Sequence, residues 1–95
     1  MTEAPLETAR LDVWLWRARF FKTRALAGRS VSKTGVRVTR FGQTRRTSKP
    51  GAGIAAGDIL TFTQGRHIQV VEVLGLGERR GPAQEAKGLY QHRDG

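Results

Sequence analysis

The chain has 95 residues, enough for one small domain and too few for a second independent core. It contains no cysteine, which excludes a disulfide framework and a thiolate metal site. The formal net charge is +9 at pH 7, and the whole excess lies in residues 1–50, whereas basic and acidic side chains balance in residues 51–95. A surface shaped only by solubility would spread its charge, so this segregation predicts a polyanionic partner.

The first nine residues carry acidic side chains and no apolar run. They match neither a signal peptide nor a membrane span, so we expect a flexible tail at 1–9 and a cytoplasmic protein. A single domain is expected over residues 10–90, followed by a second short tail at 91–95. An anionic membrane is a weaker candidate for the polyanion, because the apolar stripe of the first helix is needed inside the fold.

A first helix is predicted from apolar residues at positions i, i+3, i+4 and i+7, which are Leu11, Trp14, Leu15 and Ala18. Trp14 lies in this stripe and is expected in the core. Arg10 and Arg17 are two turns apart, so they would share a flank of the helix. Asp12 falls in the first turn, where a negative charge suits the positive end of the helix dipole.

A second helix is predicted from Arg24 to about Lys33. Thr23 is its expected N-cap, since a threonine hydroxyl accepts a bond from a free backbone N–H at this position. Gly35 fits the left-handed position after the last turn. Lys22 and Arg24 would flank the start of this helix, where free N–H groups also attract an anion, so a phosphate would find both attractions in one place.

Trp16 and Phe20 are four residues apart, on the face opposite the apolar stripe of the first helix. Such a pair could stack on nucleic-acid bases. The alternative is that the second helix or a C-terminal helix covers them. We favour the covered arrangement, because exposed tryptophan promotes aggregation.

Residues 36–39 alternate apolar and polar side chains, which predicts a strand with Arg37 facing solvent. A turn at 40–42 and a return strand at 43–47 would follow. Together these elements add basic side chains to the surface: Arg37, Arg40, Arg45 and Arg46.

Proline and glycines predict a loop over residues 48–53, which carries Lys49. Two further strands are predicted at 59–63 and 68–74. Pro82 can start a short final helix that ends near Tyr90. Helices first and strands after predict an α+β domain, with two N-terminal helices packed on a small antiparallel sheet.

No catalytic set is visible in the sequence. His67 and His92 have no ligand spacing to each other, and Asp58 is expected only to shape its turn. We therefore expect no enzyme activity, no cofactor and no metal.

The order of these motifs resembles the S-four-type RNA-binding domain, also called the alpha-L motif. The residues that carry the resemblance are Arg10-Leu11-Asp12, Trp14-Leu15, Lys22-Thr23-Arg24, residues 25–31, Gly35, Val36-Arg37-Val38, Lys49-Pro50 and Gly57-Asp58. Within that superfamily, Trp14-Leu15-Trp16, residues 18–24 and residues 78–83 are similar to the ribosome-associated fifteen-kilodalton heat-shock protein family. The resemblance covers roughly residues 10–90.

The resemblance implies a protein that docks on structured ribosomal RNA of the large subunit. It implies a stress-response role in ribosome quality control, on large subunits that still carry peptidyl-tRNA, with tRNA as a second candidate partner. Charge segregation and the family pattern together select the candidate RNA-binding residues: Arg10, Arg17, Lys22, Thr23, Arg24, Arg37, Arg40, Arg45, Arg46 and Lys49.

Two alternatives remain open. The chain could be an RNA-targeting module for a separate RNA-modifying enzyme, since similar domains are attached to pseudouridine synthases and tRNA synthetases. It could also be a general nucleic-acid binder that includes DNA, because phosphate contacts alone do not choose the nucleic acid. In each case we expect a monomer.

Overall fold

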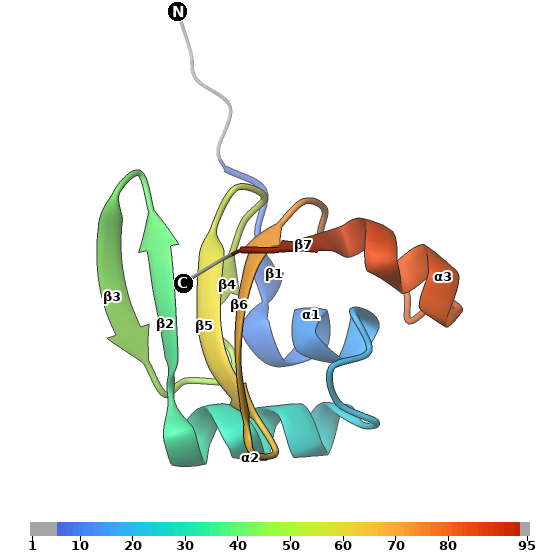
Figure 1. Ribbon diagram of the computed structural model, residues 1–95, viewed down its shortest axis with the longest axis horizontal. Helices are drawn as coiled ribbons and strands as arrows, with labels where there is room; N and C mark the ends of the chain where they lie inside the picture. The colour runs from blue at the N-terminus through green and yellow to red at the C-terminus, as the bar shows by residue number, and fades with distance from the viewer. Residues whose placement is uncertain (1–5, 94–95) are drawn as a thin grey trace, which may run out of the picture.

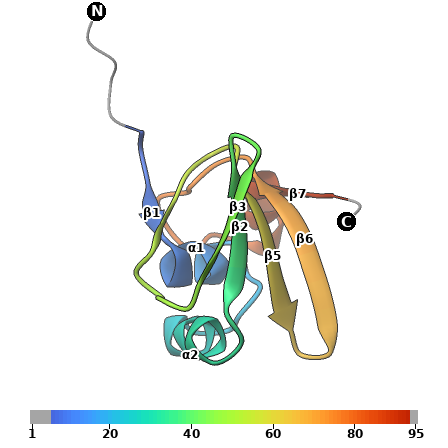
Figure 2. The ribbon, with the colours of Figure 1, turned by 90° about the vertical axis from the view of Figure 1, so that its left-hand side faces the viewer.

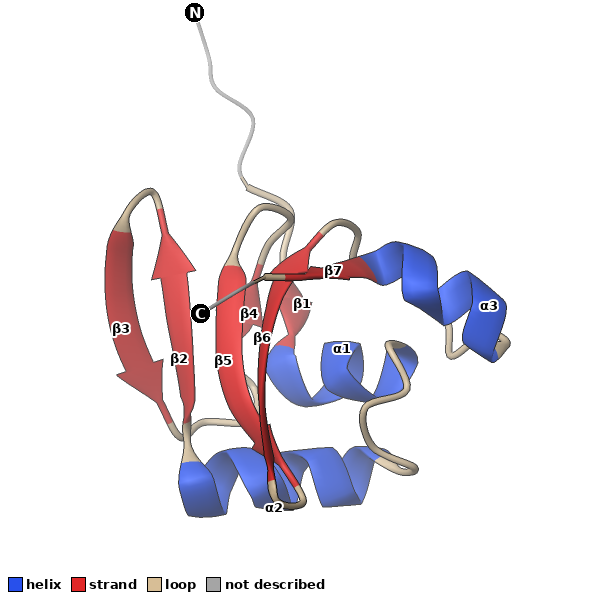
Figure 3. Ribbon diagram, viewed as in Figure 1, coloured by secondary structure: helices blue, strands red, loops and turns tan. Residues whose placement is uncertain are grey.

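The computed structural model describes residues 6–93 and packs helices against one face of an antiparallel sheet (Figures 1 and 3). The helices are α1 (Leu11–Arg17), α2 (Arg24–Thr34) and α3 (Ala83–Ala86), which continues as the 3-10 turn η1 (Lys87–Leu89). The sheet runs in the order β3 (Gln43–Thr47), β2 (Val36–Arg40), β5 (Ile59–Gln64), β6 (His67–Val73) and β7 (Tyr90–His92). A separate short ribbon pairs β1 (Ala9–Arg10) with β4 (Gly53–Ile54). The α+β class expected from the sequence is confirmed.

The core lies between α1, α2 and the inner face of the sheet. Trp14 is fully buried there, as predicted, and its indole N–H donates to the carbonyl oxygen of Gly75 at 2.8 Å. A buried indole N–H needs such a partner. The other large side chains of this core that are completely buried include Leu11, Val31, Val38, Leu60, Val71 and Val73.

α1 ends at Arg17, so the prediction that Trp16 and Phe20 share one helix face was wrong. Arg19 adopts a left-handed conformation with φ +66°. The N–H of Arg19 donates to the Trp16 carbonyl and that of Phe20 to the Leu15 carbonyl, each at 3.0 Å, which is the Schellman pattern of helix ends. A Schellman motif turns the chain away from the helix axis. Phe20 therefore does not lie on the helix face that carries Trp16.

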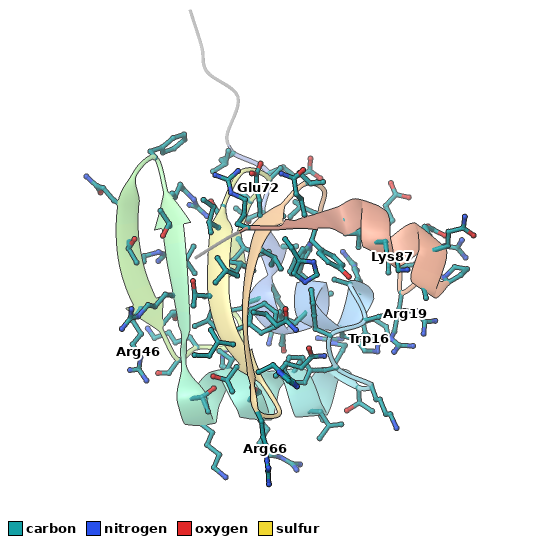
Figure 4. The ribbon with its side chains drawn as sticks, in the orientation of Figure 1. Trp16, Arg19, Arg46, Arg66, Glu72 and Lys87 are labelled. Atoms are coloured by element: carbon teal, nitrogen blue, oxygen red, sulfur yellow. The ribbon has the colours of Figure 1, made fainter. Side chains whose placement is uncertain are left out.

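Phe20 is covered, as we favoured, but by the sheet and the C-terminal segment rather than by a helix. Its ring centroid lies 5.0 Å from that of Phe62 and 4.6 Å from that of Tyr90. Trp16 remains half-buried beside the end of α1, and its carbonyl accepts a bond from Nε of Arg80 (Figure 4). Phe20 is therefore not presented as a stacking platform, whereas the Trp16 side chain is only partly covered.

α2 begins and ends where the sequence predicts. The Thr23 hydroxyl oxygen accepts a bond from the Leu26 N–H at 3.0 Å, which confirms the N-cap. Gly35 has φ +76°, and a Cβ atom there would lie 2.7 Å from the guanidinium of Arg46. With ψ 166°, this backbone conformation is open essentially only to glycine, although it is not the left-handed helical one expected; the Arg46 guanidinium is the end of a flexible side chain and could move aside.

Parts of both segments that we expected to be flexible tails pair with strands. Ala9 pairs with Ile54, and the last strand continues through Gln91 and His92 along β6, inside the segment expected as a tail. α3 is correspondingly shorter than predicted, and Pro82 is its N-cap rather than its first residue. Among residues 6–93, no helix has the length and apolar character needed to cross a membrane.

An ion pair between a partly exposed arginine and a buried carboxylate ties β2 to the turn before β5. The Arg40 guanidinium donates to both carboxylate oxygens of Asp58, at 2.8 and 2.7 Å. Asp58 is 1% exposed and also accepts a bond from the Ala55 N–H at 2.8 Å. The hydrogen bonds that Arg40 donates to the Asp58 carboxylate raise the pKa of Arg40. Arg40 therefore serves the fold.

We predict that Arg40→Ala strongly destabilises the domain, because it leaves the Asp58 carboxylate buried without its counter-charge. Breaking a fully buried pair from one side costs about 3–5 kcal/mol, and the 28% exposure of the Arg40 side chain places the expected loss near or below the lower end of that range. Thermal and denaturant melts measure the effect. Arg45→Ala, an exposed arginine on the neighbouring strand, is the matched control and should change stability by less than about 0.5 kcal/mol. Equal melting curves for the two variants would contradict the structural role of Arg40.

Candidate nucleic-acid interface

An open basic hollow lies between the start of α1, one face of α2 and the loop before β4. Its lining is Arg10, Asp12, Arg24, Ala25, Gly28, Arg29, Ser32 and Pro50. The five α2 residues lie on one side of the helix, because positions four residues apart fall above one another. Two backbone bonds fix the opposite wall: the Leu11 N–H donates to the Ala52 carbonyl and the Asp12 N–H to the Pro50 carbonyl.

The floor of the basic hollow is made of small side chains. Ala25 and Gly28 lie on α2, and Pro50 faces them from the loop. A Cβ added at Gly28 would lie 3.6 Å from Pro50 and 3.8 Å from a carboxylate oxygen of Asp12, which is ordinary contact. The hollow is therefore shallow and open, suited to a chain that lies across it rather than to an enclosed small molecule.

Asp12 is the one acidic side chain among the residues that line the basic hollow. Burial opposes its ionisation, but bonds from Arg10 at 3.1 Å and from the Val13 N–H at 2.8 Å outweigh that cost. Together with the charges of Arg10 and Arg24, these bonds lower the pKa of Asp12. The carboxylate thus neutralises much of Arg10, whose side chain remains 55% exposed. Arg24 and Arg29 keep their charge for a ligand.

Arg24 stands just inside the first turn of α2, next to the cap made by Thr23. Both Lys22 and Arg24 are exposed. Within the described residues, neither side chain has a hydrogen-bonding partner from the protein. The first turn carries no acidic side chain. An anion at this place would therefore meet the helix dipole and two cations together.

The basic residues of the β2–β3 hairpin divide between two faces of the sheet. Arg37 and Arg46 are cross-strand neighbours on the outer face, away from the helices. Arg45 is opposite the buried Val38, so it projects toward the helix side at the free edge of β3. Figure 4 shows Arg46 at that edge, where it donates to the Thr34 carbonyl at the end of α2.

Of the candidate residues, Arg10 and Arg24 line the basic hollow, whereas Arg17 and Arg40 are engaged with other parts of the protein. Arg17 donates to the carbonyl oxygens of Leu76 and Gly77, at 3.4 and 2.9 Å, and Arg40 is held by Asp58. Arg10 precedes α1 and Arg17 ends it, so the expected shared flank does not form. Both guanidinium groups are thus held in part by the protein itself, and their place in the interface stays a prediction. Lys49 is exposed in the loop next to Pro50, so its side chain is available to a ligand.

Arg29 is the residue that the sequence interpretation missed. It lines the basic hollow together with Ala25 and Ser32. The signal was present, because these three residues stand at i, i+4 and i+7 within the predicted second helix. The family motif at Lys22 to Arg24 ends before this position, so it does not point to Arg29.

The histidines form no ligand set. His67 lies in β6 and His92 in β7, and a ring nitrogen of His92 lies 3.2 Å from the side-chain oxygen of Gln69. Over residues 6–93, no three His, Cys, Asp or Glu side chains lie close enough to hold a metal ion.

Sequence comparison places the chain beside named bacterial heat-shock proteins, although no protein-family model matches it. It is 43% identical over 91 residues to heat shock protein 15 of Escherichia coli K12, covering 96% of this chain and 65% of that protein. It is 41% identical over 93 residues to the homologue of Aeromonas salmonicida, covering 95% of this chain and 67% of that protein. The chain thus spans about two thirds of the length of these curated relatives.

A solved structure shares the fold. Heat shock protein 15 of Vibrio cholerae, described as trimeric, superposes with a TM-score of 0.77 at 36% sequence identity. The match covers 92% of this chain and 83% of that one. At this level of identity and coverage in both sequence and structure, the chain belongs to the heat shock protein 15 family.

Proposed function

We propose that this protein binds structured RNA through the basic hollow and acts as a ribosome-associated heat-shock factor. Its target would be large ribosomal subunits that carry stalled peptidyl-tRNA. The observation that carries the proposal is the pair Arg24 and Arg29, which line a shallow hollow floored by small residues. Among the described residues neither guanidinium has a hydrogen-bonding partner from the protein, so both can bind adjacent phosphates from one face of a rigid helix.

Recognition of folded RNA fits this surface better than sequence reading. The cations stand on α2 and on the β2–β3 hairpin, so their spacing is fixed by secondary structure. Phosphate contacts from such elements set register and orientation, and RNA helices are recognised chiefly by backbone and shape. The small floor at Ala25 and Gly28 would let a phosphate chain approach α2 closely.

Assignment of the S-four-type domain rests on the agreement between motif and geometry. The Thr23 cap, α2, the glycine at position 35 and the Val-x-Val start of β2 follow the family order. Membership of the heat shock protein 15 family supports the stress-response role. A cytoplasmic location follows from ribosome binding, and we propose no intrinsic catalysis for the part of the chain described.

Each of two competing functions predicts a different experimental result. A targeting module for an RNA-modifying enzyme would copurify with that enzyme, and a general nucleic-acid binder would bind duplex DNA as tightly as folded RNA at one salt concentration.

The oligomeric state is a separate question, because we expected a monomer whereas the Vibrio cholerae relative is described as trimeric. Sedimentation of the purified protein distinguishes the two.

A ribosome gradient tests the proposed role directly. In extracts of heat-stressed cells, we expect the protein to sediment with free large subunits, and to leave that fraction when peptidyl-tRNA is released with puromycin. Migration at the top of the gradient before and after stress would contradict ribosome association.

RNA binding should weaken steeply with salt, because phosphate neutralisation releases condensed counterions. If about five phosphates are neutralised, the slope of log affinity against log salt should be roughly −3.5 to −4.5. Titration of an rRNA fragment over several salt concentrations measures this slope. A slope near zero would show that charge is not the main source of affinity.

Arg24→Ala should separate binding from folding. Arg24 is exposed and has no protein partner among the described residues, so its loss should change stability by less than about 0.5 kcal/mol. RNA affinity should fall about tenfold or more, since a hydrogen bond to a charged group is worth roughly 1.5–3 kcal/mol. Arg24→Lys should restore only part of the affinity, because the planar fork is lost.

Arg93→Ala is the matched control for Arg24→Ala. Arg93 pairs with Glu72 beside β7, at the opposite edge of the sheet from the β2–β3 hairpin. Titration of the parent and three variants against one rRNA fragment, with thermal melts alongside, completes the test. Equal losses of affinity for Arg24→Ala and Arg93→Ala would move the binding face away from the basic hollow.

A further inference from the structure

The tip of the β2–β3 hairpin displays an aromatic ring that folding does not explain. Phe41 is 90% exposed, and its backbone has φ +51°. The next residue, Gly42, has φ +76°, so both central residues of the turn are left-handed. Such turns favour Asn, Asp or Gly at the first position, where a bulky side chain is strained. Phe41 is therefore strained, and burial of its ring does not offset that strain.

The hairpin holds this ring on a rigid support. Arg40 pairs with Gln43 across a two-residue turn, and the ladder continues to Val36 opposite Thr47. The hydroxyls of Thr39 and Thr44 are 2.7 Å apart across the strands. The bonds between Arg40 and Asp58 fix the last residue before the turn. An aromatic side chain held in this way loses little conformational freedom when it binds.

The surroundings of Phe41 are basic and polar. It lines a small surface hollow with Arg40, Gln43, Thr44 and Arg45. Between Asp12 and Asp58 the sequence has no acidic residue, while eleven Arg and Lys side chains fall in that interval. A protein partner with an apolar pocket would require a wider apolar surface around the ring. One exposed ring beside an exposed arginine suits a nucleic-acid base next to a phosphate instead.

We propose that Phe41 stacks on an unpaired base of the bound RNA while Arg45 contacts the adjoining phosphate. The hairpin tip would thus be a second contact, beyond the basic hollow on α2. This inference rests on the proposed RNA-binding function. Figure 2 views the protein from the hairpin side, with β3 in front and α2 below it. A strand of five residues spans roughly 17 Å, so the RNA must extend at least that far beyond the base of the hairpin.

Phe41→Asn tests the stacking role without endangering the fold. Asn-Gly is the sequence preferred in this kind of turn, so the variant should melt at the temperature of the parent or above it. The probes are an rRNA stem–loop with 2-aminopurine in the loop and a fully paired duplex of the same stem. The parent should prefer the stem–loop and quench the 2-aminopurine fluorescence. Phe41→Asn should abolish the quenching and weaken stem–loop binding about five- to 150-fold.

Three readouts separate stacking from charge. Phe41→Asn should leave duplex affinity and the salt slope unchanged, because the ring carries no charge. Phe41→Trp should retain the preference for the stem–loop. Arg45→Ala should reduce the salt slope by about one unit on the stem–loop. The same loss on stem–loop and duplex for Phe41→Asn would overturn the stacking role.

The outcomes also distinguish this inference from the proposed function. If the parent binds both RNAs with a steep salt slope but shows neither quenching nor a preference for the stem–loop, the stacking role is wrong and the function stands. If the parent binds neither RNA, both are wrong. If Phe41→Asn binds RNA like the parent but sediments differently, Phe41 contacts protein rather than RNA.

Discussion

The basic hollow depends on how the start of α1 is held. Arg10 occupies the N-cap position but makes no side-chain hydrogen bond that caps the helix, and a seven-residue helix has few internal bonds of its own. The N–H groups of Leu11 and Asp12 donate instead to the carbonyls of Ala52 and Pro50. These bonds satisfy two of the free donors of α1 and fix the loop opposite α2. Without them Pro50 would not form the floor of the hollow.

The structure divides the arginines into two groups that composition alone cannot separate. Some bind the protein's own oxygen atoms: Arg40 holds Asp58, and Arg17 holds the loop at residues 76–77. Others, such as Arg24 and Arg45, project into solvent. The difference is set by distant partners, since the carboxylate of Asp58 comes eighteen residues after Arg40. A guanidinium bonded to the protein's own oxygen atoms stabilises the fold, while an exposed one without such a bond remains available to a ligand.

Local signals made α2 and the β2–β3 hairpin predictable. A capping threonine, a glycine at the helix end and strict alternation each specify geometry within a few residues. The end of α1 was not predictable in this way, because Arg19 takes the left-handed position where glycine is usual. β7 pairs with β6 about twenty residues away, and a short polar strand carries no periodic signal of its own. Arg29 could be found from the helix pattern, whereas the bond between Arg17 and Gly77 joins residues sixty positions apart and has no local signal.

The placement of the acidic residues strengthens the segregated charge. Asp12 pairs with Arg10, Asp58 with Arg40, Glu72 with Arg93 and Glu85 with Arg79. Because each of these carboxylates has a cation beside it, its field is cancelled locally and subtracts little from the α2 and β3 side. Residues 22–49 carry basic side chains and no acidic one, so that side keeps its positive potential. A potential of this kind accelerates the encounter with a polyanion and fades over about 10 Å at 0.1 M salt. Orientation then depends on short-range contacts, which only the rigid elements α2 and the β2–β3 hairpin can supply.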